Sequence, residues 1–444
     1  MRYLGTAGLI AFVAICTPAF AQEKTSSADA VAGPKSITDI AGCFSAKQDT
    51  GTYLLAALPK NWSGNLVVFA HGGPAIVPPM STYSELDLNK YSFAVKRGFA
   101  WIASSYRREG YGVRMAVEDT EDARRFFVDH IARPRRTILH GASYGGLVSA
   151  KLLEMYARSA DGTVNYDGGL LNSGFVAGAP LGYEFRADLR VIYQYYCDNL
   201  PHPEEPQYPL WTGIPAESKM TLKDLQALVN ECTGVDRAAD QRSEVQKQKL
   251  ANILAVMRFP QALLVRHMQA ATLLLREIAQ RITNGRSAFS NEGVYYKGSS
   301  DDVALNRGVA RVSADPRAVA ALKADGMPTG SLQAPVVSIH SINDPQVAVE
   351  VQSSYREVVD AAGNRNRLVQ AFTDENAHTG QSTPELSAAL EALMQWVEQG
   401  VMPTPQAIAA SCERLRGSFD EPCRYHPEFM PKPYNTRYAR GELK

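Results

Sequence analysis

The stretch Arg136–Ala150, R-T-I-L-H-G-A-S-Y-G-G-L-V-S-A, restricts the fold of this chain more than any other. A short apolar run at 137–139 stops abruptly at G-A-S-Y-G, residues 141–145, and a helix-like segment follows at once, residues 146–157. The pattern predicts a strand, a sharp turn and a helix, with Ser143 at the turn. Because glycine has no Cβ, the two flanking glycines relieve the crowding that so tight a turn imposes.

Ser143 gains two chemical advantages from this position. The turn holds its hydroxyl clear of the sheet, and the positive end of the following helix lies beside it. G-x-S-x-G in this context is the pattern of a nucleophile elbow. The motif also arises by accident, so the prediction of a nucleophile depends on a base, an acid and an oxyanion-binding loop elsewhere in the chain.

The first residues are predicted to be a secretory signal peptide. A weakly basic start precedes an apolar run at residues 9–16, and A-F-A at 19–21 has the small residues of a cleavage site. We expect cleavage after Ala21 and a secreted or periplasmic protein. No later stretch of eighteen apolar residues follows, so no membrane span is expected. Residues 23–34 are small and polar and are predicted to be a disordered linker.

Charge and length narrow the possible partners and the domain count. Lys and Arg number 46, as do Asp and Glu, so the chain has no basic excess for binding nucleic acid. We expect a small-molecule ester or short-peptide substrate, and the oligomeric state stays open. About 420 mature residues are more than one catalytic α/β domain needs, so an inserted subdomain is expected.

Five cysteines remain after the signal peptide, and export permits disulfides. Cys197 with Cys232 and Cys412 with Cys423 are the nearest pairs in the sequence, which would leave Cys43 free. Other connectivities stay open, because sequence alone does not fix them. No C-x-x-C motif or histidine cluster suggests a metal site, and we expect neither metal nor cofactor.

Strands that are apolar along their whole length alternate with helical segments. Such alternation predicts a mostly parallel, doubly wound sheet with helices on both faces, in the α/β class. Strands are expected at residues 52–58, 66–70, 99–104, 168–172, 335–340 and 367–372, and helices at 91–97, 119–131, 347–361 and 384–399, the last with Thr383 as its cap.

Residues 184–333 break this rhythm and are predicted to be a helical lid inserted between two core segments, 22–183 and 334–401, before a tail at 402–444. Helical spacing is found at 222–229, 245–257 and 260–282, with no clear strand. Loops rich in proline and aromatic residues, among them 193–196 and 201–209, are expected between the helices. The aromatic residues of the lid either line an apolar pocket or, as we favour, mostly pack its own core. They are Tyr193, Tyr195, Tyr196, Tyr208, Trp211, Tyr295 and Tyr296.

Four polar groups follow predicted strands in one chain order. H-G-G-P at 71–74 follows the strand at 66–70, and Ser143 follows the strand before the elbow. Asp344 and His378 follow the two strands beyond the insertion. In open α/β sheets such groups meet outside the carboxyl ends of the strands. The order Ser, Asp, His is the one found in α/β-hydrolases.

On these residues the chain resembles α/β-hydrolases of the serine-hydrolase kind, over residues 52–174 and 334–400. G-A-S-Y-G-G and H-G-G-P are most similar to the prolyl-oligopeptidase-like and proline-iminopeptidase-like branches. Secreted bacterial carboxylesterases of this fold use the same catalytic set. No propeller-sized domain precedes the core, and the insertion carries no recognisable peptide-binding motif. We therefore predict a carboxylic ester substrate, with a serine peptidase acting on short peptides as the alternative.

The chemistry of acyl transfer assigns the roles. A serine hydroxyl needs a neighbouring base, so His378 would take the proton of Ser143 and return it to the leaving group. Asp344 would orient the imidazole and stabilise its positive form. Asp374 and Glu375 are closer to His378 in sequence, but they lie on the wrong side of the last strand. A non-catalytic binding protein on the same scaffold is disfavoured, because every triad position is filled.

The tetrahedral oxyanion needs two aimed hydrogen-bond donors. The backbone N–H of Tyr144, just after the nucleophile, is one candidate, and that of Gly73 is the other. His71 is predicted to hold the oxyanion loop rather than to take part in the reaction.

Overall fold

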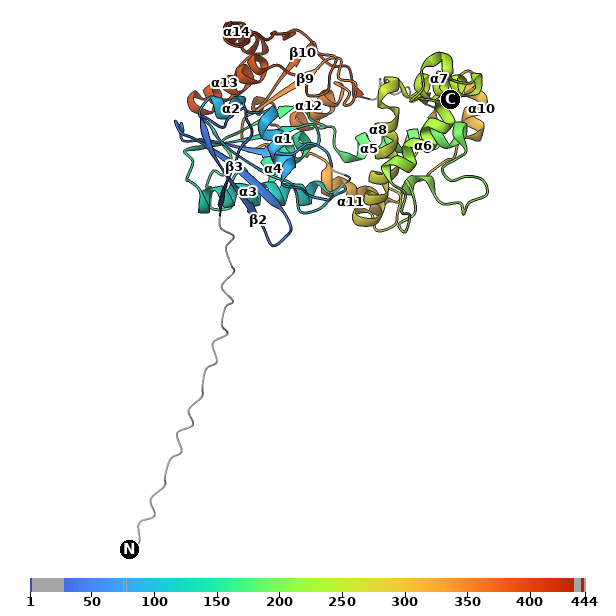
Figure 1. Cartoon of the computed structure of the whole chain (residues 1–444), viewed down its shortest axis with the longest axis horizontal. Helices are drawn as coiled ribbons and strands as arrows, with labels where there is room; N and C mark the ends of the chain where they lie inside the picture. Colours follow the sequence, from blue (N-terminus) through green and yellow to red (C-terminus); the bar gives the residue numbers. More distant parts are fainter. Residues whose placement is uncertain (2–27, 75, 77, 435–440, 443–444) are drawn as a thin grey trace.

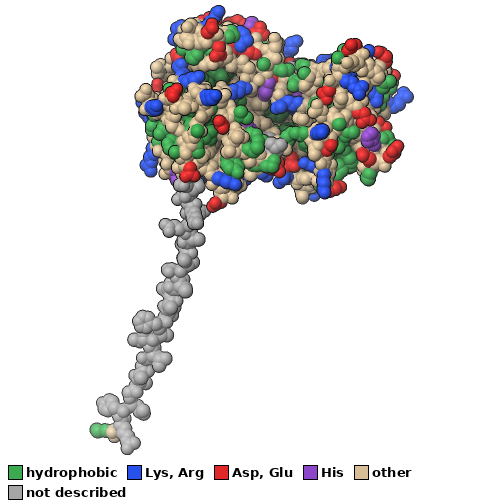
Figure 2. All heavy atoms as spheres, in the orientation of Figure 1, with side chains coloured by type: hydrophobic (Ala, Val, Ile, Leu, Met, Phe, Trp, Pro, Cys, Tyr) green, Lys and Arg blue, Asp and Glu red, His purple; other side chains and the backbone are tan. Residues whose placement is uncertain are grey.

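The computed structural model describes residues 1, 28–74, 76, 78–434 and 441–442 (Figure 1). The predicted signal peptide lies outside the described residues except for Met1, and so does the tail at 435–440. Two lobes lie side by side, one built on a sheet and one helical, and the space-filling view in Figure 2 shows an indentation of the outline between them. Within these residues, no helix combines the length and apolar character that crossing a membrane requires.

One sheet of nine strands forms the first lobe, in the order β1-β2-β3-β5-β4-β6-β7-β9-β10. From β5 to β10 all neighbours are parallel, whereas β1, β2 and β3 pair antiparallel with their neighbours. The mostly parallel α/β class is confirmed. The strands are β1 Asp29–Val31, β2 Ala41–Lys47, β3 Tyr53–Pro59, β4 Asn65–Ala70, β5 Ala100–Ser104, β6 Arg136–Ala142, β7 Gly168–Asn172, β9 Val336–Ser341 and β10 Leu368–Thr373.

Two apolar cores cover the two faces of this sheet. Leu66, Val68 and Ala70 of β4 point into one core with α3 and α4, and Val67 and Phe69 point into the other with α2 and α13. Burial on both faces explains why the central strands are continuous apolar runs. The helices of this lobe are α1 Thr82–Lys90, α2 Phe93–Lys96, α3 Val113–His130, α4 Tyr144–Tyr156, α12 Val351–Ala361, α13 Thr383–Gln399 and α14 Pro405–Arg416.

Between β7 and β9 the chain builds the helical lobe, residues 179–326, called the insertion below. It has an apolar core of its own, and a disulfide between Cys197 and Cys232 joins its first two helices. Its α-helices are α5 Ala179–Cys197, α6 Leu222–Thr233, α7 Glu244–Met257, α8 Leu264–Gln269, α9 Leu275–Glu277, α10 Asp302–Gly308 and α11 Pro316–Gly326.

The insertion differs from its sequence prediction in three ways. Residues 193–196, predicted as loop, end the helix α5, because packing in the core outweighs the low helix propensity of aromatic residues. The predicted helix at 260–282 is interrupted by two π-helical turns, residues 270–274 and 278–282. A strand is present after all: β8, Val294–Tyr295, pairs with β11, Gly441–Glu442.

Smaller corrections concern the two ends of the sheet lobe. Residues 29–31, predicted as disordered linker, form β1 and pair with β2. Helix α13 is capped by Ser382 instead of Thr383, in a capping box with Glu385. The second expected disulfide, Cys412–Cys423, is present in the tail and Cys43 is free.

Two buried carboxyl groups lie where the tail meets the sheet. Glu385 accepts hydrogen bonds from the backbone N–H groups of Ser382 and Arg424, both at 2.7 Å. Glu375 lies 3.2 Å from the Arg424 guanidinium. Burial, followed by the adjacent Glu385, raises the pKa of Glu375 to about 8.

The raised pKa of Glu375 predicts that the free energy of unfolding falls as pH rises. The unfolded chain releases the Glu375 proton near pH 4.5 and the folded chain only near pH 8, so folding is weakened progressively between those values. Glu375→Gln should remove a slope of up to about 1.4 kcal/mol per pH unit from this window. Urea unfolding at pH 5, 6.5 and 8 measures it, with exposed Glu357→Gln as control. Parallel curves for Glu375→Gln and wild type would contradict the assignment.

Candidate active site

Ser143 occupies the sharp turn between β6 and α4, in a strained backbone conformation with φ 58° and ψ −121°. A Cβ at Gly145 would lie 2.0 Å from the carbonyl oxygen of Ala70, and one at Gly141 would lie 2.1 Å from the oxygen of Gly145. Only glycine is compatible with such close approach of β4, β6 and α4. The predicted elbow geometry is therefore present in the structure.

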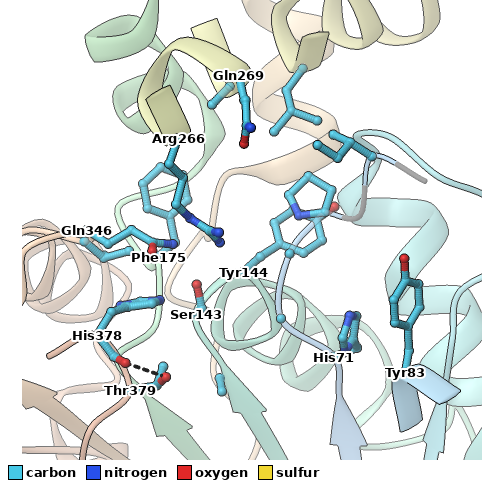
Figure 3. A pocket seen from close by; sticks show the side chains of 18 of the residues that line it. His71, Tyr83, Ser143, Tyr144, Phe175, Arg266, Gln269, Gln346, His378 and Thr379 are labelled. Atoms are coloured by element: carbon cyan, nitrogen blue, oxygen red, sulfur yellow. Dashed lines mark hydrogen bonds between the residues drawn. The ribbon is translucent and has the colours of Figure 1, made fainter. Parts of the chain in front are cut away.

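The structure brings His378 and Asp344 together at the ends of neighbouring strands. The distance from His378 Nδ1 to Asp344 Oδ2 is 2.7 Å. The opposite ring atom, His378 Nε2, is buried without a hydrogen-bond partner among the described residues. In Figure 3 this ring points toward Ser143. The unpartnered Nε2 is thus the atom available to accept a proton from that side.

Asp344 is held as an anion although it is buried. Burial by itself would raise the pKa of Asp344, but the hydrogen bond and positive charge of His378, with His340 and the Val347 N–H, outweigh it and lower the pKa. Its Oδ1 accepts from the backbone N–H groups of Gln346 and Val347, both at 2.9 Å. One carboxylate oxygen is therefore fixed by the loop and the other by the imidazole.

The rival acids do not reach His378. Asp374 accepts a hydrogen bond from Asn343 at 2.8 Å, and Glu375 belongs to the buried cluster beneath the tail. His340 lies 3.6 Å from Asp344 and is fully buried, and its Nε2 lies 2.9 Å from the Val347 carbonyl oxygen. Burial, which outweighs the neighbouring Asp344, lowers the pKa of His340, and its ring packs beside the acid.

Contacts of His71 hold the loop after β4 in position. Its Nδ1 lies 2.5 Å from Asp87 Oδ2, its ring stacks on Tyr83 with 5.3 Å between centroids, and its carbonyl accepts from Tyr106 Oη at 2.8 Å. Figure 3 shows His71 and Tyr83 beside one another, turned away from Ser143. This geometry agrees with a structural role for His71.

Both predicted oxyanion donors border the cavity above Ser143. Gly73 and Tyr144 are among its lining residues. Tyr144 is the first residue of α4, so its N–H has no intrahelical acceptor. The structure thus places Gly73 and Tyr144 at the same cavity as Ser143.

The cavity has a volume of about 530 Å³ and lies where the two lobes meet. Beside the loops of the sheet, the insertion contributes Tyr183 and Arg186 from α5, Arg266 from α8, and Gln269. None of the seven aromatic residues singled out in the insertion lines it, which agrees with the favoured alternative that they pack the insertion. The two arginines were missed, because nothing local in the sequence shows which insertion residues face the sheet.

The topology explains why these groups meet. β5 pairs with one side of β4 and β6 with the other, so the strand order reverses at β4. Ligands bind at such a switch point, outside the carboxyl ends of the strands. His71 follows β4 and Ser143 follows β6 there, with a Ser–Asp–His order along the chain. The chain has the α/β-hydrolase fold.

Comparisons with known proteins find similarity among solved structures, all of low identity. No family model and no curated protein matches the sequence. Among solved structures, feruloyl esterase B from Aspergillus oryzae is 13% identical, with 85% of this chain and 86% of that chain covered and a TM-score of 0.43. Lipase A from Candida antarctica is 12% identical, with 88% and 90% covered and a TM-score of 0.45.

A puromycin-hydrolyzing peptidase from Mycobacterium tuberculosis is similar at 14% identity, with 84% of this chain and 39% of that chain covered and a TM-score of 0.38. Esterases, a lipase and a peptidase thus stand side by side among the similar structures. At these identities and TM-scores they decide nothing about the substrate of this chain.

Because α4 and β4 approach each other so closely at Gly145, we predict that one added methyl group there has a strong effect. Gly145→Ala should displace α4 from β4, because the new Cβ would lie 2.0 Å from the Ala70 oxygen. We expect a loss of about 1–3 kcal/mol of unfolding free energy or more, with loss of any serine reactivity. Gly417→Ala is the control, since no atom lies within 4 Å of its Cβ position. Denaturant unfolding compares them, and equal stability would contradict the packing described.

Proposed function

We propose that this α/β-hydrolase is a secreted serine hydrolase that cleaves carboxylic esters through a covalent acyl-enzyme. The observation that carries the proposal is the arrangement at the strand ends. A strained serine faces the free Nε2 of a histidine, and the Nδ1 of that histidine lies 2.7 Å from a buried carboxylate. The two disulfides are compatible with export.

The reaction follows from these positions. His378 Nε2 takes the proton of Ser143 as its Oγ attacks the ester carbonyl, and Asp344 stabilises the imidazolium. The N–H groups of Tyr144 and Gly73 receive the developing oxyanion. The proton then passes from His378 to the departing alcohol, leaving the acyl group on Ser143. Water activated by the same histidine releases the acid.

The insertion acts in this proposal as the lid that selects the substrate. It supplies one wall of the cavity, while the nucleophile and the oxyanion loop supply the opposite wall. A site walled in this way can hold the ester carbonyl in the orientation that attack by Ser143 requires. No metal or cofactor has a role in the proposed mechanism.

The serine mechanism predicts that two substitutions abolish turnover and leave the fold intact. Ser143→Ala should lower kcat/KM for p-nitrophenyl esters by more than about 10⁴-fold, and Asp344→Asn by a comparable factor, because the imidazole then adopts the wrong tautomer. Labelling by a fluorophosphonate should be lost in Ser143→Ala. Ser149→Ala, at a buried serine six residues further along the chain in α4, is the matched control. Full activity of Ser143→Ala would overturn the mechanism.

The choice of ester over amide has its own test. Short-chain p-nitrophenyl esters should be turned over faster than aminoacyl- and prolyl-anilides at equal concentration. Strong anilide turnover with negligible ester turnover would instead support the serine-peptidase alternative.

A further inference from the structure

Two arginines of the insertion line the cavity above Ser143. Arg186 comes from α5 and Arg266 from α8, eighty residues later in the chain. In Figure 3 Arg266 extends from its helix toward Ser143, beside Gln346. A cavity built only for an apolar ester has no use for two positive charges, which cost free energy when they are withdrawn from water.

Neither guanidinium has a carboxylate partner in the described part of the chain. Among those residues no carboxylate oxygen lies within 4.0 Å of either arginine. Of the described residues that line the cavity, Asp87 alone is acidic, and it already lies 2.5 Å from His71. The positive charge is therefore not neutralised from within this cavity wall.

Arg186 is held in a fixed position, as a binding group must be. Its guanidinium carbon lies 5.2 Å from the ring centroid of Phe175 and 5.7 Å from that of Tyr183. Its Nη1 donates to the Gly182 carbonyl at 2.6 Å, while its Nε is buried without a hydrogen-bond partner in the described residues. Stacking of this kind orders the side chain and leaves a donor unused.

The positive charge of Arg186 acts on Arg266. Burial first, and then the positive charge of Arg186, lower the pKa of Arg266. The two guanidinium groups are thus close enough to repel one another in the cavity. An anion placed between them relieves this repulsion, and a planar carboxylate matches the fork geometry of guanidinium donors.

We propose that Arg186 and Arg266 form a subsite for a carboxylate carried by the substrate, so that the enzyme acts on esters with a free acid group. The inference rests on the proposed serine mechanism, and it names the substrate class of the same site. The carboxylate belongs to the acyl chain or to the leaving alcohol, and the scissile carbonyl is attacked by Ser143 in either case.

Two matched substrate pairs test the proposal. On the acyl side, p-nitrophenyl hydrogen adipate is compared with p-nitrophenyl hexanoate. On the alcohol side, 4-acetoxybenzoate is compared with its methyl ester. For each pair the measured quantity is the ratio of kcat/KM for the anionic substrate to kcat/KM for the neutral one, corrected for spontaneous hydrolysis.

In at least one pair, Arg266→Gln should lower this ratio about tenfold or more, and Arg186→Gln/Arg266→Gln should lower it further. Arg266→Lys keeps the charge and should restore part of the ratio. Arg307→Gln, at an exposed arginine of α10 outside the cavity, is the control and should leave the ratio unchanged. The groups around Arg266 partly withdraw its guanidinium from water, but the residue as a whole is exposed, so its single variant should fold even if the Arg186 variant does not.

A second readout does not depend on turnover. Adipate should slow fluorophosphonate labelling of Ser143 in the wild type and slow it much less in Arg266→Gln. Unchanged ratios in both pairs, with adipate acting equally on wild type and variant, would overturn the carboxylate subsite. That failure is distinct from failure of the serine mechanism, which would show as continued turnover by Ser143→Ala.

Discussion

The close contact between the first turn of α4 and the end of β4 is the constraint on which the site depends. A side chain at Gly145 has no room, because the Ala70 carbonyl oxygen occupies its place. Ala70 is also the last residue of β4 and leads directly into the His71 loop. One packing contact therefore sets both the strained turn at Ser143 and the position of the loop that faces it. Strain of this kind persists only where the surrounding structure over-determines it, which two buried cores and parallel pairing of β4 with β6 provide here.

The sequence could predict those strands, helices and site residues that are determined by a local motif or by a regular pattern of apolar residues. Central strands buried on both faces must be apolar throughout, and β7 was bounded correctly at residues 168–172 for that reason. The triad candidates were found because chain order and strand ends fix where they meet. The helix α5 and the strand β1 were missed, since aromatic packing in the insertion and pairing with β2 determine them. Neither cause leaves a pattern within the segment itself.

The residues of the site also divide into those that sequence could predict and those that it could not. Asp344 and His378 follow strands and could be named from sequence, whereas Asp87 and the two arginines could not. The Asp87 contact with His71 spans sixteen residues, and Arg186 and Arg266 meet at the cavity from helices eighty residues apart. Such contacts depend on how the insertion packs against the sheet lobe. The residues of the proposed catalytic set can therefore be named from the order of the strands. The insertion residues that border the cavity depend on packing that leaves no pattern in the sequence.

Close packing holds the insertion in position where it lines the cavity. At Gly182 of α5 a Cβ would lie 1.4 Å from the ring of Phe175, in the loop that follows β7, and that ring also lies under the Arg186 guanidinium. At its other end α5 is tied to α6 by the Cys197–Cys232 disulfide. A helix fixed at both ends presents its side chains to Ser143 with little freedom. The positive charge beside Ser143 is thus held by ordered packing, and in the proposed subsite an ordered cationic wall would recognise an anion at a smaller entropic cost than a mobile one.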